Sequence, residues 1–426
     1  MELIIITFFI LGYTAIALEH SIKIDKAASA LITGVLCWVI YIVFVPDKHI
    51  VNEQLTGHLG EVSGILFFLL GAMTIVELID AHEGFNIITS RITSTNKRSM
   101  LWIIGFITFF LSAVLDNLTT TIVIISLLKK LIKKDEDRLF YAGIVIIAAN
   151  AGGAWSPIGD VTTTMLWIGG QVTAVNIIAK LLLPSLVCLT VPLIFMSFRM
   201  KGDVSRPSLK VTEHSNILPQ KYQYIVLISG ILVLISVPVF KTTTHLPPYM
   251  GMLFGLAILW IVTSILHKSD EHTYKNKFSV AQALRNIDTP SILFFLGILI
   301  SISALQSVGI LTHLSHKMST YIANENIIVM AIGLLSSIVD NVPLVAATQG
   351  MYSLVQYPAD HYFWEFLAYA TGTGGSALVI GSAAGVVAMG MEKISFMWYL
   401  RKISWLALIG FFSGAVVYIL QDYFLH

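Results

Sequence analysis

The sequence predicts an all-α polytopic membrane protein, built as an inverted repeat with two re-entrant helical hairpins and two broken transmembrane helices. Hydrophobic residues fill 56% of the 426 positions and charged residues only 12%, whereas a soluble protein of this length needs a far more charged surface. Apolar runs of about 20 residues, the length that crosses a bilayer, recur along the whole chain. Two blocks of matching motifs also follow one another in the same order.

Apolar stretches with the length of a membrane span follow one another along the chain. They cover residues 2–18, 26–45, 61–80, 139–170, 175–198, 222–240, 249–267, 290–310, 361–390 and 402–420. The first reads MELIIITFFILGYTAIAL and has neither a basic start nor an obvious small-residue cleavage site, so we expect a span and not a cleaved signal. We divide the chain into N-terminal scaffold helices (1–60), a first repeat (61–200), a linker with scaffold helices (201–289) and a second repeat (290–426).

Two further apolar segments, residues 99–128 and 326–356, each hold a single charge, Asp116 or Asp340. About 30 residues of helix extend over ~45 Å, which is long for one crossing of a ~30 Å hydrocarbon core and short for two. A re-entrant hairpin fits this length, and one tilted, overlong helix is the alternative. Basic residues flank both ends of the first segment, at 91–98 and 129–138, so we expect both of its ends on the cytoplasmic side.

The two halves of the chain share motifs in the same order. The letters ILFFL occur at 65–69 and again at 292–296, and each is followed by an Asp-Asn pair. A glycine-rich interruption then comes at 150–159 (NAGGAWSPIG) or at 372–381 (GTGGSALVIG). The span count gives the halves opposite orientations, and inverted repeats with interrupted helices are typical of secondary transporters. The glycine-rich stretches lack the lysine of a phosphate loop, so we interpret them as helix breaks with free carbonyls, with plain helix packing as the alternative.

An isolated carboxylate inside hydrocarbon is costly and needs a partner. No lysine or arginine occupies the predicted hairpins or broken helices, which leaves a proton or a bound cation as partner of Asp116, Asp160 and Asp340. Carboxylate, amide and hydroxyl oxygens suit a hard cation such as Na⁺ or Li⁺. We therefore predict that cation and proton compete for these three aspartates.

Polar residues around the aspartates complete the candidate site, although any single hydroxyl more often bonds its own helix backbone. The predicted ion-binding residues are Ser112, Asp116, Asn117, Asn150, Asp160, Thr162, Thr163, Asp340, Asn341, Thr371 and Ser382. Glu77 is either a residue of the ion path or part of a solvated cluster at the end of its span. The net charge of +1 predicts no nucleic-acid partner, and the two cysteines in apolar runs predict neither a disulfide framework nor a cysteine metal site. We expect no cofactor apart from the transported ions.

Four motifs carry a resemblance to a known family: GAMTIVELIDAHEGF, SAVLDNLTTTIV, ANAGGAWSPIGDVTTTMLW and SIVDNVPLVAA. They resemble the NhaD-type sodium/proton antiporters of the ion-transporter superfamily, from about residue 60 to the C-terminus. The resemblance implies a multi-pass exchanger of the bacterial inner membrane that exports Na⁺ or Li⁺ against protons. It further implies a homodimer with a fixed scaffold, a mobile transport part and elevator-like alternating access.

Two other functions compete with this interpretation. Relatives in the same superfamily carry dicarboxylates, citrate or arsenite, but their dicarboxylate sites rely on Ser-Asn-Thr tips, whereas this chain has Asp-Asn, whose charge repels an anion. Two membrane-buried aspartates also occur in intramembrane aspartyl proteases, where they share a proton and activate water. That enzyme class needs Gly-x-Gly-Asp and Pro-Ala-Leu motifs; this sequence has only SPIGD and contains no PAL.

Overall fold

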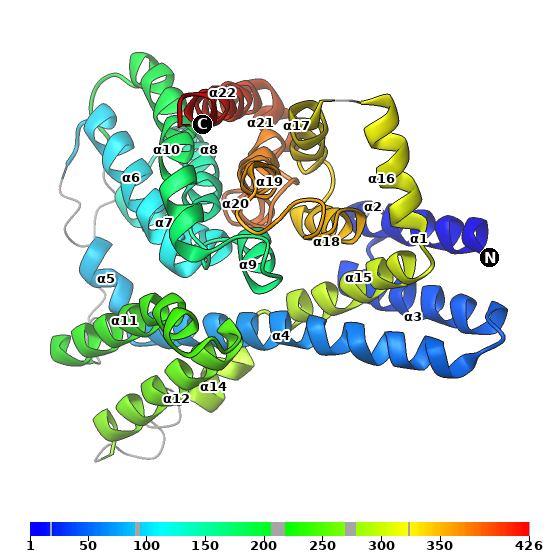
Figure 1. Ribbon diagram of the computed structural model, residues 1–426. Coiled ribbons are helices and arrows are strands. Elements are labelled where there is room, and N and C mark those ends of the chain that lie inside the picture. Colours follow the sequence, from blue (N-terminus) through cyan, green and yellow to red (C-terminus); the bar gives the residue numbers. More distant parts are fainter. Residues whose placement is uncertain (18, 90–93, 206–217, 269–277, 323, 426) are drawn as a thin grey trace.

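The computed structural model describes residues 1–426 except 18, 90–93, 206–217, 269–277, 323 and 426, and its described elements are helical (Figure 1). Eight of these helices are long and apolar enough to cross a membrane. They are α3 (Lys26–Phe44), α4 (Lys48–Ala81), α6 (Lys97–Leu115), α10 (Ala174–Arg199), α11 (Gln220–Thr244), α12 (Pro248–Leu266), α15 (Thr289–Ser307) and α22 (Ser404–Leu425). The predicted all-α polytopic membrane protein is thereby confirmed.

The remaining helices are shorter or more polar. They are α1 (Glu2–Ala17), α2 (Glu19–Ile22), α5 (Gly84–Thr89), α7 (Asn117–Leu131), α8 (Asp135–Ala154), α9 (Val161–Ile168), α14 (Val280–Asn286), α16 (Ile310–Tyr321), α17 (Glu325–Leu335), α18 (Asn341–Met351), α19 (Tyr362–Gly374), α20 (Ala383–Glu392) and α21 (Phe396–Lys402), with a 3₁₀ turn, η1, at Gly375–Ala377. Parts of the basic loops in the topology argument, including Arg91, lie outside the described residues.

Helix α4 is longer than the sequence predicts. The predicted span covers residues 61–80, but the helix starts at Lys48, where the Asp47 side chain accepts a hydrogen bond from the His49 amide at 2.9 Å. Hydropathy does not locate the start of α4, because it detects only apolar residues. The first turns of α4 are polar but still helical. Its 34 residues extend over ~50 Å, across the width of the molecule in Figure 1.

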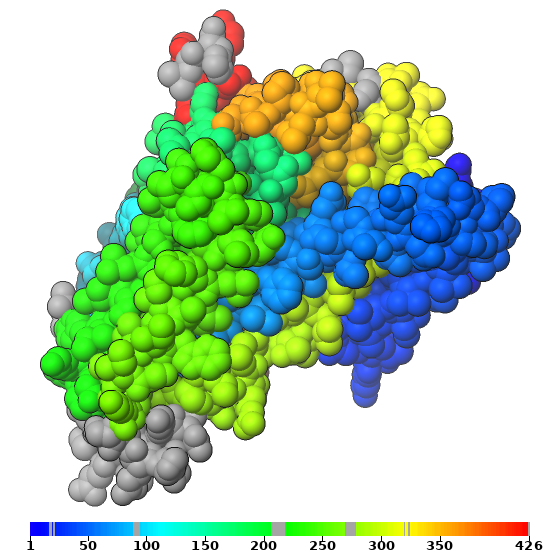
Figure 2. All heavy atoms as spheres, turned by 60° about the horizontal axis from the view of Figure 1, so that its bottom comes forward, coloured from blue at the N-terminus to red at the C-terminus, as the bar shows by residue number. Residues whose placement is uncertain are grey.

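Helix α4 joins two groups of helices. Helices α3 and α15 pack on the part that begins at Lys48, while α11 and α12 pack toward the other end. Figure 2 shows α4 in blue against the green surface of α11 and α12. Two glycines mark this contact, because a Cβ at Gly71 would lie 2.7 Å from Met252 and one at Gly64 would lie 3.1 Å from Tyr249.

Helices α3 and α15 cross at very close range. A Cβ added at Gly297 would lie 2.5 Å from the carbonyl carbon of Ala30, and one at Gly34 would lie 2.7 Å from the Gly297 oxygen. The Trp38 indole also donates to the Ile300 carbonyl at 2.9 Å. This packing fixes the start of α3, and with it Lys26, beside the start of α15.

The segment 99–128 forms two helices, α6 and α7, joined at Asp116, which has a positive φ of 88°. The amides of Lys97 and Lys133 at the two outer ends donate to Gly202 and Ser205 at 3.0 and 2.9 Å. Both ends of the pair therefore meet the same loop. The segment 326–356 likewise forms α17 and α18, separated by residues 336–340.

Both glycine-rich stretches interrupt a helix. Helix α8 ends at Ala154 and α9 starts at Val161, and α19 with η1 ends at Ala377 before α20 starts at Ala383. The two halves of the chain pack on one another: α19 contacts α8, α20 contacts α7, and α18 contacts α9. This arrangement brings the two Asp-Asn turns and the two interruptions into one region.

Candidate functional site

All three predicted aspartates line one cavity of about 70 Å³. Asp116 and Asp160 come from the first half of the chain and Asp340 from the second, and α4 closes one wall with apolar side chains such as Phe68. Asn117 and Asn341 line the same cavity. Carboxylates that lie far apart in the sequence thus share a single chamber.

Each of these aspartates caps the start of a helix. Asp116 caps α7 by accepting hydrogen bonds from the Thr119 amide at 2.8 Å and the Thr119 hydroxyl at 2.9 Å. Asp160 caps α9 through the Thr162 amide at 2.8 Å and the Thr162 hydroxyl at 2.6 Å. Asp340 caps α18. The positive end of a helix dipole favours a negative group at each position.

The first half of the site is a closed hydrogen-bond network. The Asn117 amide nitrogen donates to Asp160 at 2.6 Å and to the Asn150 side-chain oxygen at 3.1 Å. The Asn150 amide nitrogen in turn donates to the hydroxyls of Ser376 and Ser382, both at 2.9 Å. Asn150 therefore links α8 of the first half to η1 and the start of α20 in the second half.

In the second half of the site, the polar side chains make fewer hydrogen bonds. Within the described part of the chain, the Asp340 side chain accepts only a long hydrogen bond of 3.3 Å, from the Val342 amide. The side-chain oxygen of Asn341 is buried and has no hydrogen-bond partner among the described residues, and the residue is 5% exposed. A buried amide oxygen without a donor is costly unless a ligand supplies the contact.

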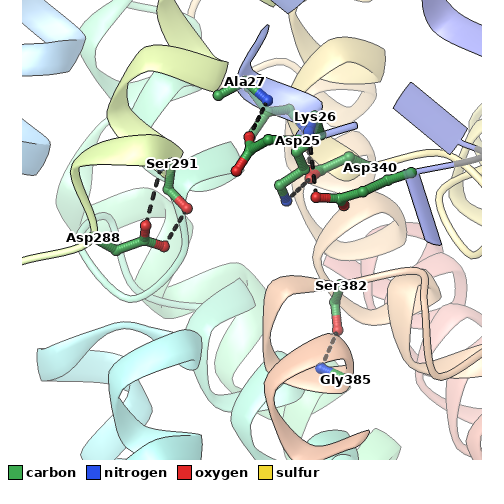
Figure 3. A network of polar contacts seen from close by, with 10 residues as sticks. Asp25, Lys26, Ala27, Asp288, Ser291, Asp340, Ser382 and Gly385 are labelled. Carbon is green, nitrogen blue, oxygen red and sulfur yellow. Dashed lines mark hydrogen bonds and ion pairs between the residues drawn. The ribbon is translucent and has the colours of Figure 1, made fainter. Parts of the chain in front are cut away.

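The structure adds a residue that the sequence did not indicate. The ammonium of Lys26, in the first turn of α3, lies 3.9 Å from Asp340 Oδ2, and Figure 3 shows the two side chains pointing toward one another. The predicted hairpins themselves contain no lysine, but this one reaches in from another helix. Lys26 begins an apolar run, where a basic residue is ordinary, so no local signal distinguishes it.

The other predicted residues differ in their positions. Ser382 lines a second, larger cavity, whereas Ser112, Thr163 and Thr371 point their hydroxyls at the carbonyls of Ala149, Ala154 and Leu367. Those three hydroxyls are thus engaged with backbone. Glu77 accepts a hydrogen bond from Asn286 of α14 at 2.8 Å and is not among the described residues that line either cavity.

The larger cavity, of about 440 Å³, reaches the site from the side where α3 and α15 begin. Its lining includes the carboxylates of Glu19, Asp25 and Asp288 as well as Asp340, and Lys26 is the basic residue among its described lining. Figure 3 shows Asp25 and Asp288 on the α3 and α15 side of Asp340. An acidic entrance raises the local concentration of cations.

Comparison with known proteins shows the family to which the chain belongs. The sequence profile of a family described as "Citrate transporter" matches residues 5–374. The chain belongs to the citrate transporter family. This family membership, with the antiporter relatives below, makes the chain a secondary transporter and not an enzyme, which excludes the intramembrane protease.

Relatives from a plant and from bacteria match almost the whole chain. "Sodium/proton antiporter 1" and "Sodium/proton antiporter 2" of Arabidopsis thaliana are 48% and 46% identical, over 96% of this chain in each case and over 71% and 97% of their own lengths. "Na(+)/H(+) antiporter NhaD" of Vibrio cholerae is 29% identical over 97% of this chain and 91% of its own length. The resemblance to NhaD-type antiporters is confirmed by these matches.

Proposed function

We propose that this chain is a sodium/proton antiporter that also accepts lithium. The observation that carries the proposal is the shared cavity of Asp116, Asp160 and Asp340. Relatives that align over nearly the whole chain bear sodium/proton antiporter in their names. Site chemistry and family relationship therefore support the same substrate.

The donor set suits a small hard cation. The three aspartates and Asn341 line one small chamber, and the side-chain oxygen of Asn341 has no hydrogen-bond partner among the described residues. Hard cations prefer such oxygen ligands. Negative charges gathered in one chamber repel one another, and a cation or a proton on one carboxylate relieves that repulsion. A proton on the site therefore leaves as a cation binds, and exchange follows when each is released on the opposite side of the membrane.

An anionic substrate is the competing possibility, because the matching family is described as "Citrate transporter" and citrate is an anion. A citrate or arsenite-type anion would meet three carboxylates and one lysine in the small cavity. The net charge of these groups repels an anion. We therefore favour a cation within this family.

We further infer that the α6–α7 and α17–α18 pairs are re-entrant hairpins and that α8–α9 and α19–α20 are the broken helices of an inverted repeat. The hydrogen bonds from Lys97 and Lys133 to one loop support a return to the same side for the first pair. These elements would form the mobile part of an elevator, carried by a scaffold of α3, α4, α11, α12 and α15. The homodimer and the role of Glu77 stay predictions.

The span count puts the acidic mouth of the larger cavity on the cytoplasmic side, so this conformation would accept Na⁺ from the cytoplasm. The relatives come from a plant and from bacteria, so they give no support for one particular membrane, and the bacterial inner membrane stays a prediction. The chain is a multi-pass membrane protein in either case.

The test is exchange by the purified protein in proteoliposomes with an acidic interior. Addition of Na⁺ or Li⁺ outside should collapse the pH gradient, while K⁺, citrate and arsenite should not. Asp116→Asn should abolish this exchange, since asparagine still caps α7 but supplies no charge. Asp47→Asn, at the exposed cap of α4, is the matched control and should exchange like the wild type. A gradient that responds to citrate alone would overturn the proposal.

A further inference from the structure

The Lys26 side chain is held in place by its surroundings. The Asp25 carboxylate accepts a hydrogen bond from the Ala27 amide at 2.7 Å and so caps α3 immediately before Lys26. The Lys26 ammonium then lies over the ring of Phe294, 4.7 Å from its centre. Phe294 is fully buried in α15, and a cation is attracted to the face of an aromatic ring. Lys26 is therefore directed at the cavity.

The contact with Asp340 is an ion pair without a short hydrogen bond. The nitrogen–oxygen distance is 3.9 Å, and the two side chains are 28% and 25% exposed. Partly exposed pairs of this kind are weak and can be broken. The ammonium nevertheless lies where both cavities meet Asp340, because Lys26 and Asp340 line both.

A bound metal cation and this ammonium would compete for the same negative charge. The Asp340 carboxylate has a single charge, and its other polar contact in the described part of the chain is the 3.3 Å bond from Val342. A Na⁺ on Asp340 and Asn341 would lie a few ångströms from the ammonium, and like charges repel at that range. The binding of Na⁺ at Asp340 thus requires that Lys26 give up its partner.

We propose that Lys26 is the internal competitor for the transported cation: its ammonium neutralises Asp340 while the site is empty and is displaced when Na⁺ binds. This inference rests on the proposed function. The lysine keeps the empty chamber from holding three unpaired carboxylates. It also weakens Na⁺ binding, so that the ion can leave again after transport.

The test is equilibrium binding of ²²Na⁺ to the purified full-length protein, with exchange measured in parallel. Removal of the competitor in Lys26→Gln should tighten Na⁺ binding by up to about fivefold, which corresponds to the upper value of ~1 kcal/mol for a partly exposed ion pair. Lys26→Met, of similar length and uncharged, should do the same and replaces the glutamine variant if that one fails to insert. Lys26→Arg keeps the positive charge and should bind Na⁺ with wild-type affinity.

Lys23→Gln is the matched control, because Lys23 is an exposed lysine of the same short connection. It should bind Na⁺ like the wild type. Unchanged or weaker binding by both Lys26→Gln and Lys26→Met overturns the inference, and so does an equal shift in Lys26→Arg, which would indicate a packing effect. A wild type that binds Na⁺ without exchange overturns the proposed function alone, and the variants still decide the role of Lys26. A wild type that does not bind Na⁺ overturns both.

Discussion

The two asparagines of the site, Asn117 and Asn341, differ in their hydrogen bonds. Asn117 and Asn341 both follow an aspartate at the turn of a helix pair, so their sequence contexts predict the same role. Asn117 donates to Asp160 and Asn150, whereas the oxygen of Asn341 has no partner in the described part of the chain. We therefore propose that Asn117 stabilises the fold and that the Asn341 oxygen is a ligand of the transported cation.

Alanine at these two positions should separate the two roles. Asn341→Ala should weaken Na⁺ binding by about tenfold or more without lowering the melting temperature, because it removes an unsatisfied buried oxygen. Asn117→Ala should lower the free energy of unfolding by about 1–3 kcal/mol, because it leaves buried acceptors without their donor. Thermal melts and ²²Na⁺ binding on both variants provide the check. Wild-type Na⁺ affinity in Asn341→Ala would show that this oxygen is not a ligand.

At the same scale, the sequence predicted the acidic residues that line the small cavity but not the side chains around them. A lone aspartate in an apolar run is conspicuous because its insertion is costly, so Asp116, Asp160 and Asp340 could be named in advance. Lys26 could not, because its contact with Asp340 depends on how α3 packs in three dimensions. The hydroxyls of Ser112 and Thr371 were equally ambiguous, since a serine or threonine that bonds backbone looks the same in sequence.

Among the elements, the crossing of α3 and α15 determines where Lys26 stands. A side chain at Gly297 would collide with the backbone of Ala30 and Leu31, because a Cβ there would lie 2.5 Å from an atom of each. Backbone cannot move aside as a flexible side chain can, so the two helices must separate. We infer that this glycine is required for the approach of α3 to α15.

Gly297→Val should therefore destabilise the protein by about 2 kcal/mol or more, in the range of overpacked cores. Gly60→Val is the matched control: Gly60 also lies in a long helix, but a Cβ there meets nothing within 4 Å. The control should melt at or slightly above the wild-type temperature, because valine has a higher helix propensity than glycine. Equal melting temperatures for the two variants would contradict the close crossing.

Element boundaries were predictable where lipid contact decides them. The predicted span 26–45 is α3 at Lys26–Phe44, and the predicted span 175–198 is α10 at Ala174–Arg199. The start of α4 was wrong because polar turns continue the helix beyond the apolar run. Short amphipathic helices such as α14 and α16 were not predicted, since each is too short to give a period that stands out from a loop.

At the scale of the whole molecule, both halves of the chain contribute residues to the same cavity. Asp160 and Asp116 come from the first half and Asp340 from the second, and Asn150 ties the halves through Ser376 and Ser382. The order of matched motifs predicted such a shared site in outline. It did not predict its asymmetry, because the network around Asn117 and the ion pair at Asp340 arise only from packing.

The central claim is that one chamber holds either Na⁺ or a proton. Its most direct test is the affinity of the purified protein for ²²Na⁺ across a series of pH values. Competition predicts that, at pH values where the empty site is protonated, the apparent Kd for Na⁺ rises about tenfold for each unit by which the pH falls. One proton is then released for each Na⁺ bound. A Kd for Na⁺ that stays constant over the whole pH range would contradict the account.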